Sequence, residues 1–245
     1  MNETVTPDAK RRGGRRERRD LRTRPDHAML PTLAGQLPLT EPMDQEQIER
    51  IDAASLDILE EVGVVFRDDI ALEDWRKAGA DVRGERVHLD RGLVKSLIKT
   101  IPSEITLHAR NPEKTVALGG RQSIFIPMTG APYLRDLEDV RRAPTLDDLA
   151  TFHKLAHMLP AMHSSAHHIV EPMDHPISHR HLRITHSSML YSDKTFMGMT
   201  TSGQNAEDVL DMCAILFGEE YLETHAVVCG SCTGTSPRVW EGTML

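Results

Sequence analysis

Histidine is the most conspicuous chemical group in this sequence. Most of the 13 histidines fall between His153 and His186, among them a His153/His157 pair at the i, i+4 spacing of one helix face and a His179/His181 pair. Imidazole is a common zinc ligand, so this density suggests a metal centre. A zinc site would also need a carboxylate or third ligand at fixed spacing, and no H-E-x-x-H or similar motif is present. We therefore expect no metal site, and interpret these histidines as surface or supporting residues.

Cys229-Gly230-Ser231-Cys232 has the C-x-x-C spacing of redox motifs and of half a zinc site. It has no second pair, and it lies in and at the end of a predicted strand rather than at a helix N-terminus. We therefore interpret it as small buried residues. With Cys213 the chain has three cysteines, an odd number that argues against a disulfide framework and favours a reducing compartment, the cytoplasm.

Charge is unevenly distributed along the chain. The formal net charge is −8, but the N-terminal segment is strongly basic. Its basic residues are Lys10, Arg11, Arg12, Arg15, Arg16, Arg18, Arg19, Arg22 and Arg24. Recurrent prolines and the lack of apolar periodicity predict that residues 1–43 are a disordered Arg-rich tail and linker. Nucleic-acid binding through this arm is an alternative, but aromatic residues make up only 4% of the chain, which weakens any role in base stacking.

No apolar run approaches the about 20 residues that cross a bilayer, and no basic segment is followed by an apolar secretory core. The sequence thus predicts neither a membrane protein nor a secreted one.

The elements that must position the candidate residues begin at Asp44. Apolar spacing predicts a helix from there to Val62, with Asp44 as its N-cap and Gly63 as its C-terminal stop. Short strands and two further helices, over 69–78 and 93–98, follow, and strand-like segments come at 105–108, 115–118 and 123–126. Residues 44–122 are therefore predicted to form a small α+β region.

From Thr145 onward, predicted helices over 145–159, 178–191 and 205–217 alternate with predicted strands over 162–169, 195–201 and 226–232. Repeated β-α units imply a parallel sheet, either a (β/α) barrel or a doubly wound sheet. No G-x-G-x-x-G or P-loop motif follows a strand, so nucleotide-binding folds lose their main support. Residues 240–245 read as the start of a helix that covers the last strand, so we expect the natural protein to continue.

Several short stretches carry a family resemblance through their order and spacing. They are Leu59-Glu60-Glu61-Val62-Gly63-Val64, Lys77-Ala78-Gly79-Ala80-Asp81-Val82, Gly84-Glu85-Arg86-Val87, Gly130-Ala131-Pro132-Tyr133, Arg142-Ala143-Pro144-Thr145-Leu146-Asp147-Asp148-Leu149, Glu207-Asp208-Val209-Leu210 and Ser236-Pro237. From about residue 44 to its end, the chain resembles the N-terminal half of the trimethylamine:corrinoid methyltransferase family.

The resemblance implies an α/β fold: an incomplete TIM-like (β/α) barrel over residues 123–245, preceded by the small α+β region and the basic tail. It also implies an enzyme that moves a methyl group from trimethylamine or a betaine-like quaternary amine to cobalt. The corrinoid (cobalamin) is carried by a partner protein, so no cofactor is bound directly, and the full-length form is expected to be a homo-oligomer. Family members run roughly twice this length and some carry pyrrolysine, so this chain is expected to be an inactive fragment.

The resemblance also locates the substrate site. Substrate contacts in a barrel come from the C-terminal ends of strands, which implies Thr129, Tyr133, His168, Thr200 and Ser231 as substrate-binding residues. No catalytic residue is assigned. A quaternary ammonium has no N–H donor, so its recognition should rest on aromatic faces and carboxylates. Tyr133 can equally be a packing residue, and a metal-dependent hydrolase on a similar barrel is a second alternative.

Overall fold

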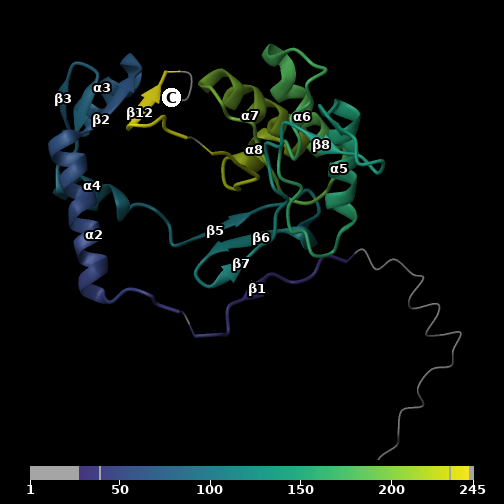
Figure 1. The fold of residues 1–245 in the computed structure, drawn as a ribbon, viewed down its shortest axis with the longest axis horizontal. Coiled ribbons are helices and arrows are strands. Elements are labelled where there is room, and N and C mark those ends of the chain that lie inside the picture. The colour runs from purple at the N-terminus through teal and green to yellow at the C-terminus, as the bar shows by residue number, and fades with distance from the viewer. Residues whose placement is uncertain (1–27, 39, 232, 243–245) are drawn as a thin grey trace, which may run out of the picture.

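The computed structural model describes residues 28–38, 40–231 and 233–242. The predicted Arg-rich arm and Cys232 lie outside these ranges. Figure 1 shows α2, α3 and α4 gathered with a small sheet on one side and α5, α6 and α7 on the other, with β5, β6 and β7 between and below them.

The first lobe opens with helix α2 (Gln45–Asp57), which starts in a capping box. Asp44 Oδ1 accepts from the Gln47 amide at 2.8 Å, and the Asp44 amide donates to Gln47 Oε1 at 3.0 Å, which confirms the predicted cap. A π-helical turn (Ile58–Val62) continues α2 and ends at Gly63, whose φ of 72° is a left-handed value. A Cβ there would lie 2.6 Å from the Val87 carbonyl oxygen, so the close approach also requires glycine.

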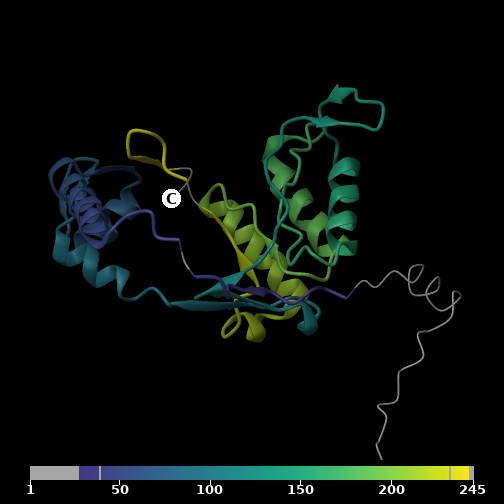
Figure 2. The same cartoon turned by 60° about the horizontal axis from the view of Figure 1, so that its bottom comes forward.

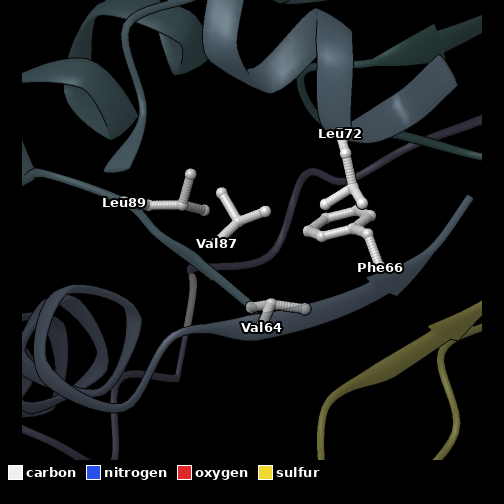
Figure 3. Packing of buried hydrophobic residues seen from close by; sticks show 5 residues of the cluster. All are labelled: Val64, Phe66, Leu72, Val87 and Leu89. Carbon is white, nitrogen blue, oxygen red and sulfur yellow. The ribbon is translucent and has the colours of Figure 1, made fainter. Parts of the chain in front are cut away.

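The sheet of this lobe has the strand order β12-β2-β4-β3. Strands β2 (Val64–Arg67), β3 (Asp81–Arg83) and β4 (Arg86–His88) are antiparallel neighbours. Helices α3 (Asp69–Lys77) and α4 (Arg91–Ile98) pack on it. Its core is Val64, Phe66, Leu72, Val87 and Leu89, with the Phe66 ring beneath Leu72 in Figure 3.

The C-terminal segment contradicts its sequence-based expectation, because the predicted helix over 240–245 is wrong for the described part. Val239–Glu241 instead form β12, which pairs in parallel with β2. The Trp240 ring stacks on Phe66, with centroids 6.5 Å apart. The Val65 amide also donates to the Arg238 carbonyl at 3.0 Å, so the extended form is stabilised by an apolar core and a strand edge that a local pattern does not reveal.

The region between the lobes is built from short antiparallel pairs. β5 (Glu104–Leu107) pairs with β6 (Val116–Gly119) around the 3₁₀ turn Pro112–Lys114, and β7 (Gln122–Ser123) pairs with β1 (Leu33–Ala34). The expectation of a disordered linker is therefore wrong for Leu33–Ala34. These residues pair with the exposed edge of β7, a pairing that local sequence patterns do not predict. Strands β8 (Leu134–Arg135) and β9 (Arg141–Arg142) form a hairpin that projects at the upper right of Figure 2.

The second lobe contains the predicted helices as α5 (Leu146–Met158), α6 (Ile177–Tyr191) and α7 (Gly203–Phe217), with the short α8 (Glu219–Leu222) after them. Thr145 and Asp148 form a capping box at the start of α5. The helix predicted over 205–217 begins two residues earlier, because the N-cap is Ser202, whose hydroxyl accepts from the Asn205 amide at 3.1 Å. No helix in the described residues is long and apolar enough to cross a membrane.

Four strand-like segments of this lobe lie side by side in chain order, and each neighbouring pair is parallel. The bridges are Ala131↔Val170 and Ser164↔Thr195, followed by the pairing of β10 (Phe196–Met197) with β11 (Val228–Cys229). The predicted strand over 162–169 is only bridged, and Ala166 within it has a φ of 55°, which breaks an extended strand. Helices α5, α6 and α7 connect successive segments, while the barrel itself stays a prediction.

Lys194 fixes the start of the third segment against the end of α5. Its ammonium is buried and donates to the carbonyls of Ala156, Leu159 and Met162 at 2.8, 2.8 and 2.7 Å. These carbonyls lie at and beyond the helix C-terminus, where a cation is favoured. Burial lowers the pKa of Lys194 to about 8. The residue therefore holds β10 and α5 together.

Candidate functional site

A cluster of polar side chains forms where the second parallel segment ends. It consists of His167, His168, Glu171 and Arg180, and is called the strand-end cluster below. The backbone amide of Gly130 donates to the His168 carbonyl at 2.7 Å, and the Glu171 amide donates to the Ala131 carbonyl at 2.9 Å. The cluster thus lies where the first two parallel segments finish.

Arg180, in the first turns of α6, fixes the carboxylate of the cluster. Its Nη1 donates to Glu171 Oε1 at 2.6 Å, while its Nε and Nη2 donate to the His175 carbonyl at 3.2 and 2.8 Å. The second carboxylate oxygen, Oε2, lies 3.8 Å from His168 Nε2, too far for a hydrogen bond. Glu171 is therefore anchored through one oxygen and directs the other toward His168.

The two imidazoles of the cluster are in contact, with ring centroids 4.0 Å apart and planes at 65°. Burial, followed by the neighbouring His168 and His153, lowers the pKa of His167 to about 4. Burial also lowers the pKa of His168, against the opposing effect of Glu171. Both rings are therefore neutral at neutral pH, and the buried Nδ1 of each has no hydrogen-bond partner among the described residues.

Gly130 lies beside the His168 ring. Its φ is 80°, and a Cβ on Gly130 would lie 3.4 Å from His168 Nε2. A side chain at Gly130 would be strained by this φ, and its Cβ would be in van der Waals contact with the imidazole.

Behind the cluster, a buried network holds the second segment against α5 and α6. His153 Nε2 lies 2.6 Å from the His167 carbonyl, which can only accept, so Nε2 carries the proton. The Ser187 hydroxyl then donates to His153 Nδ1 across 2.8 Å, and the Ser188 hydroxyl lies 3.2 Å from Nε2. Burial lowers the pKa of His153 to about 4, against the bond to the His167 carbonyl. His153 therefore supports the strand-end cluster from behind. This agrees with the interpretation of the histidines as surface or supporting residues.

At the ends of the third and fourth segments, Thr200 lies against Gly230. A Cβ on Gly230 would overlap Thr200 Oγ1, so only glycine fits. The Thr200 hydroxyl is buried and has no hydrogen-bond partner in the described part of the chain. Ser231, the next residue, is exposed. Ser231 therefore lies one residue along the chain from the contact between Thr200 and Gly230.

Thr129 precedes and Tyr133 follows Ala131, the bridged residue of the first segment. Tyr133 is 52% exposed, and the Arg141 guanidinium lies 4.0 Å above its ring, which joins it to the β8–β9 hairpin. That contact supports the packing role for one ring face. Thr129 is half-buried and precedes Gly130, the residue that contacts His168. The convergence of all five predicted residues on one opening stays a prediction.

Glu171 and Arg180 were not anticipated from the sequence. The available signal was a carboxylate directly after the predicted strand over 162–169, because polar residues at strand ends are site candidates. The pairing with Arg180 depends on where α6 begins after a loop, which local patterns do not give.

Metal and thiol chemistry find little support in the described residues. No group of three or more His, Cys, Asp or Glu side chains there is arranged to hold a metal ion. Burial raises the pKa of Cys213 to about 11 and raises that of Cys229, so both thiols stay protonated and poorly nucleophilic.

Comparison with known proteins gives a consistent family. A family model described as trimethylamine methyltransferase matches residues 11–245. The chain is 39% identical over 210 residues to a glycine betaine methyltransferase of Desulfitobacterium hafniense (strain Y51), covering 85% of this chain and 44% of that protein. It is 26% identical over 200 residues to trimethylamine methyltransferase MttB of Desulfitobacterium hafniense (strain DSM 10664 / DCB-2), covering 78% and 39%.

A third relative is a proline betaine:corrinoid methyltransferase of Eubacterium limosum, with 33% identity over 112 residues, 44% of this chain and 22% of that protein. The chain spans less than half the length of these curated relatives.

Proposed function

We propose, from the premise that this chain belongs to the trimethylamine methyltransferase family, that the complete protein moves a methyl group from a betaine-like quaternary amine to a corrinoid on a partner protein. The observation that carries the proposal is the 39% identity to a glycine betaine methyltransferase across 85% of the chain. The 26% identity to a trimethylamine enzyme supports a betaine over trimethylamine as the substrate.

We also propose that the four parallel segments are the first units of a (β/α) barrel. Their consecutive parallel order, with a helix between neighbours, supports this fold. In such a barrel the segment ends face one opening, so Thr129, Tyr133, His168, Thr200 and Ser231 would surround the substrate.

The chemistry divides between the partners. The corrinoid supplies a strongly nucleophilic cobalt when bound to its own protein, so no general base is required of this chain. The chain's residues would bind the amine, hold its C–N bond in line and exclude water. A quaternary ammonium cannot donate a hydrogen bond, which favours carboxylates and ring faces at the opening.

The test is a demethylation assay with the full-length enzyme and its cognate reduced corrinoid protein. Trimethylamine, glycine betaine, proline betaine and carnitine are compared by cobalt absorbance and by detection of the demethylated amine. We expect glycine betaine to be turned over fastest. Turnover of none of the four would remove the proposal, and a preference for trimethylamine would remove the betaine assignment.

Residues 1–245 alone span less than half the length of the relatives, so we propose that they show no methyl transfer. The same assay on this chain, beside the full-length enzyme, decides the point, and measurable turnover by the shorter chain would contradict it.

A further inference from the structure

We propose that His167, His168 and Glu171 form the subsite that binds the quaternary ammonium group of the substrate, and that Arg180 is its positioning residue. The class of substrate is taken from the proposed function. The further inference names the residues that hold the positively charged end of that substrate.

The first argument is the second carboxylate oxygen of Glu171, which has no hydrogen-bond partner among the described residues. Arg180 bonds Glu171 through Oε1 at 2.6 Å, which leaves Oε2 toward the His168 ring at 3.8 Å. A methylated ammonium has a diffuse positive charge and no N–H, so it needs a negative charge and apolar or π contact rather than hydrogen-bond acceptors. Glu171 Oε2 supplies the charge, beside the rings that supply the contact.

The second argument is the state of the two rings. His167 and His168 lie at 65° with centroids 4.0 Å apart, so they present differently directed ring surfaces beside the carboxylate. Since their pKa values are lowered by burial, they remain neutral and do not repel a cation at neutral pH. In a chain with only 4% aromatic residues, the neutral imidazoles add to the π surface that Tyr133 offers at these segment ends.

The third argument is that the cluster suits a cation better than an anion. Three of the five N–H groups of the Arg180 guanidinium already donate, to Glu171 or to the His175 carbonyl. An incoming carboxylate would instead meet the free oxygen of Glu171. The negative end of a betaine must therefore be held elsewhere.

Accessibility is consistent with binding. The side chains of His168 and Glu171 are 20% and 19% exposed, so a small ligand can reach them while most of their surface is shielded from water. Partial desolvation strengthens an ion contact relative to a fully exposed pair.

The experiment measures binding of tetramethylammonium, a probe with only the cationic end, to the full-length protein by calorimetry. Acetate is the matched anionic probe. Glu171→Gln keeps the size of the side chain and can still accept from Arg180, but it removes the charge. We expect tetramethylammonium affinity to fall about tenfold, the loss of one charged contact. Glu138→Gln, on the exposed β8–β9 hairpin, is the control and should bind like the wild type.

The His168 variants separate a ring contact from a structural role. His168→Phe keeps a π face and should retain tetramethylammonium binding, whereas His168→Ala should weaken it. This pair also tests the proposal if Glu171→Gln does not fold, as judged by its thermal transition.

The proposal is overturned if the wild type does not bind tetramethylammonium, if Glu171→Gln binds it unchanged, or if His168→Phe and His168→Ala lose binding equally. Weakened acetate binding with intact tetramethylammonium binding would instead assign the cluster to the substrate carboxylate. These binding measurements need no corrinoid. If no amine reacts in the demethylation assay, the proposed reaction is refuted, but the proposed ammonium subsite is not.

Discussion

The neutral His153 at the centre of the buried network makes stability depend on pH. Its pKa in the folded chain is about 4, below the ordinary 6.5, chiefly because of burial. The unfolded chain binds this proton once the pH falls below about 6.5, whereas the folded chain binds it only near pH 4. Stability is therefore fully present above pH 6.5 and declines as the pH falls through that window.

The size of the effect follows from the two pKa values. Near pH 5 most unfolded molecules are protonated at this site and few folded ones are, so the free energy of unfolding should be about 2 kcal/mol lower than near pH 7 through His153 alone. His153→Gln can still bond Ser187 and the His167 carbonyl, but it does not titrate. The stability difference between wild type and variant should thus narrow by about 2 kcal/mol between these pH values.

Urea unfolding of both proteins, followed by circular dichroism at several pH values, measures this difference. The control is His179→Gln, an exposed position on the same helix as Ser187. Any change with pH in its stability difference from the wild type reports effects that lie outside the buried network. If wild type and His153→Gln lose stability in parallel as the pH falls, His153 is not held neutral by burial and the reasoning is wrong.

Other substitutions probe contacts that join distant elements. Lys194→Met leaves three carbonyls without their donor and should lower the free energy of unfolding by about 3 kcal/mol in urea titration; a loss under about 1 would contradict the buried ammonium contact. Gly63→Ala should lower the free energy of unfolding by about 3 kcal/mol, but Gly79→Ala by only about 1 kcal/mol. Both glycines have a positive φ, but only a side chain at Gly63 would clash with a carbonyl. Equal losses of stability in thermal unfolding would exclude the clash. Trp240→Ala should lower the free energy of unfolding by about 1–2 kcal/mol and remove part of the tryptophan fluorescence emission. An unchanged midpoint of unfolding would argue against the packing of β12 on the first lobe.

Much of the secondary structure was predictable because its signals are local. The caps formed by Asp44 with Gln47 and by Thr145 with Asp148 act within one turn, so the sequence alone places the starts of α2 and α5. The alternation of helices with short buried segments likewise predicted parallel pairing, which β10 and β11 confirm.

The candidate site was predictable only in part. Residues at segment ends could be named from the alternation, and His168 and Thr200 do lie at such ends, beside Gly130 and Gly230. The partners of Glu171 could not be named, because the contact with Arg180 requires the loop before α6 to fold back on the second segment.

The sequence by itself determined the family, the helices α2, α5, α6 and α7 and the parallel pairing of the later segments, since these depend on neighbouring residues and on the spacing of apolar side chains. The tertiary structure alone decided that Val239–Glu241 form a strand on β2, that the Lys194 ammonium bonds the end of α5, and that Glu171 lies between Arg180 and His168. Each of these depends on which surfaces meet after the chain has folded. A strand edge, an unpaired carbonyl or a free carboxylate oxygen acquires its partner only when segments far apart in sequence are brought into contact.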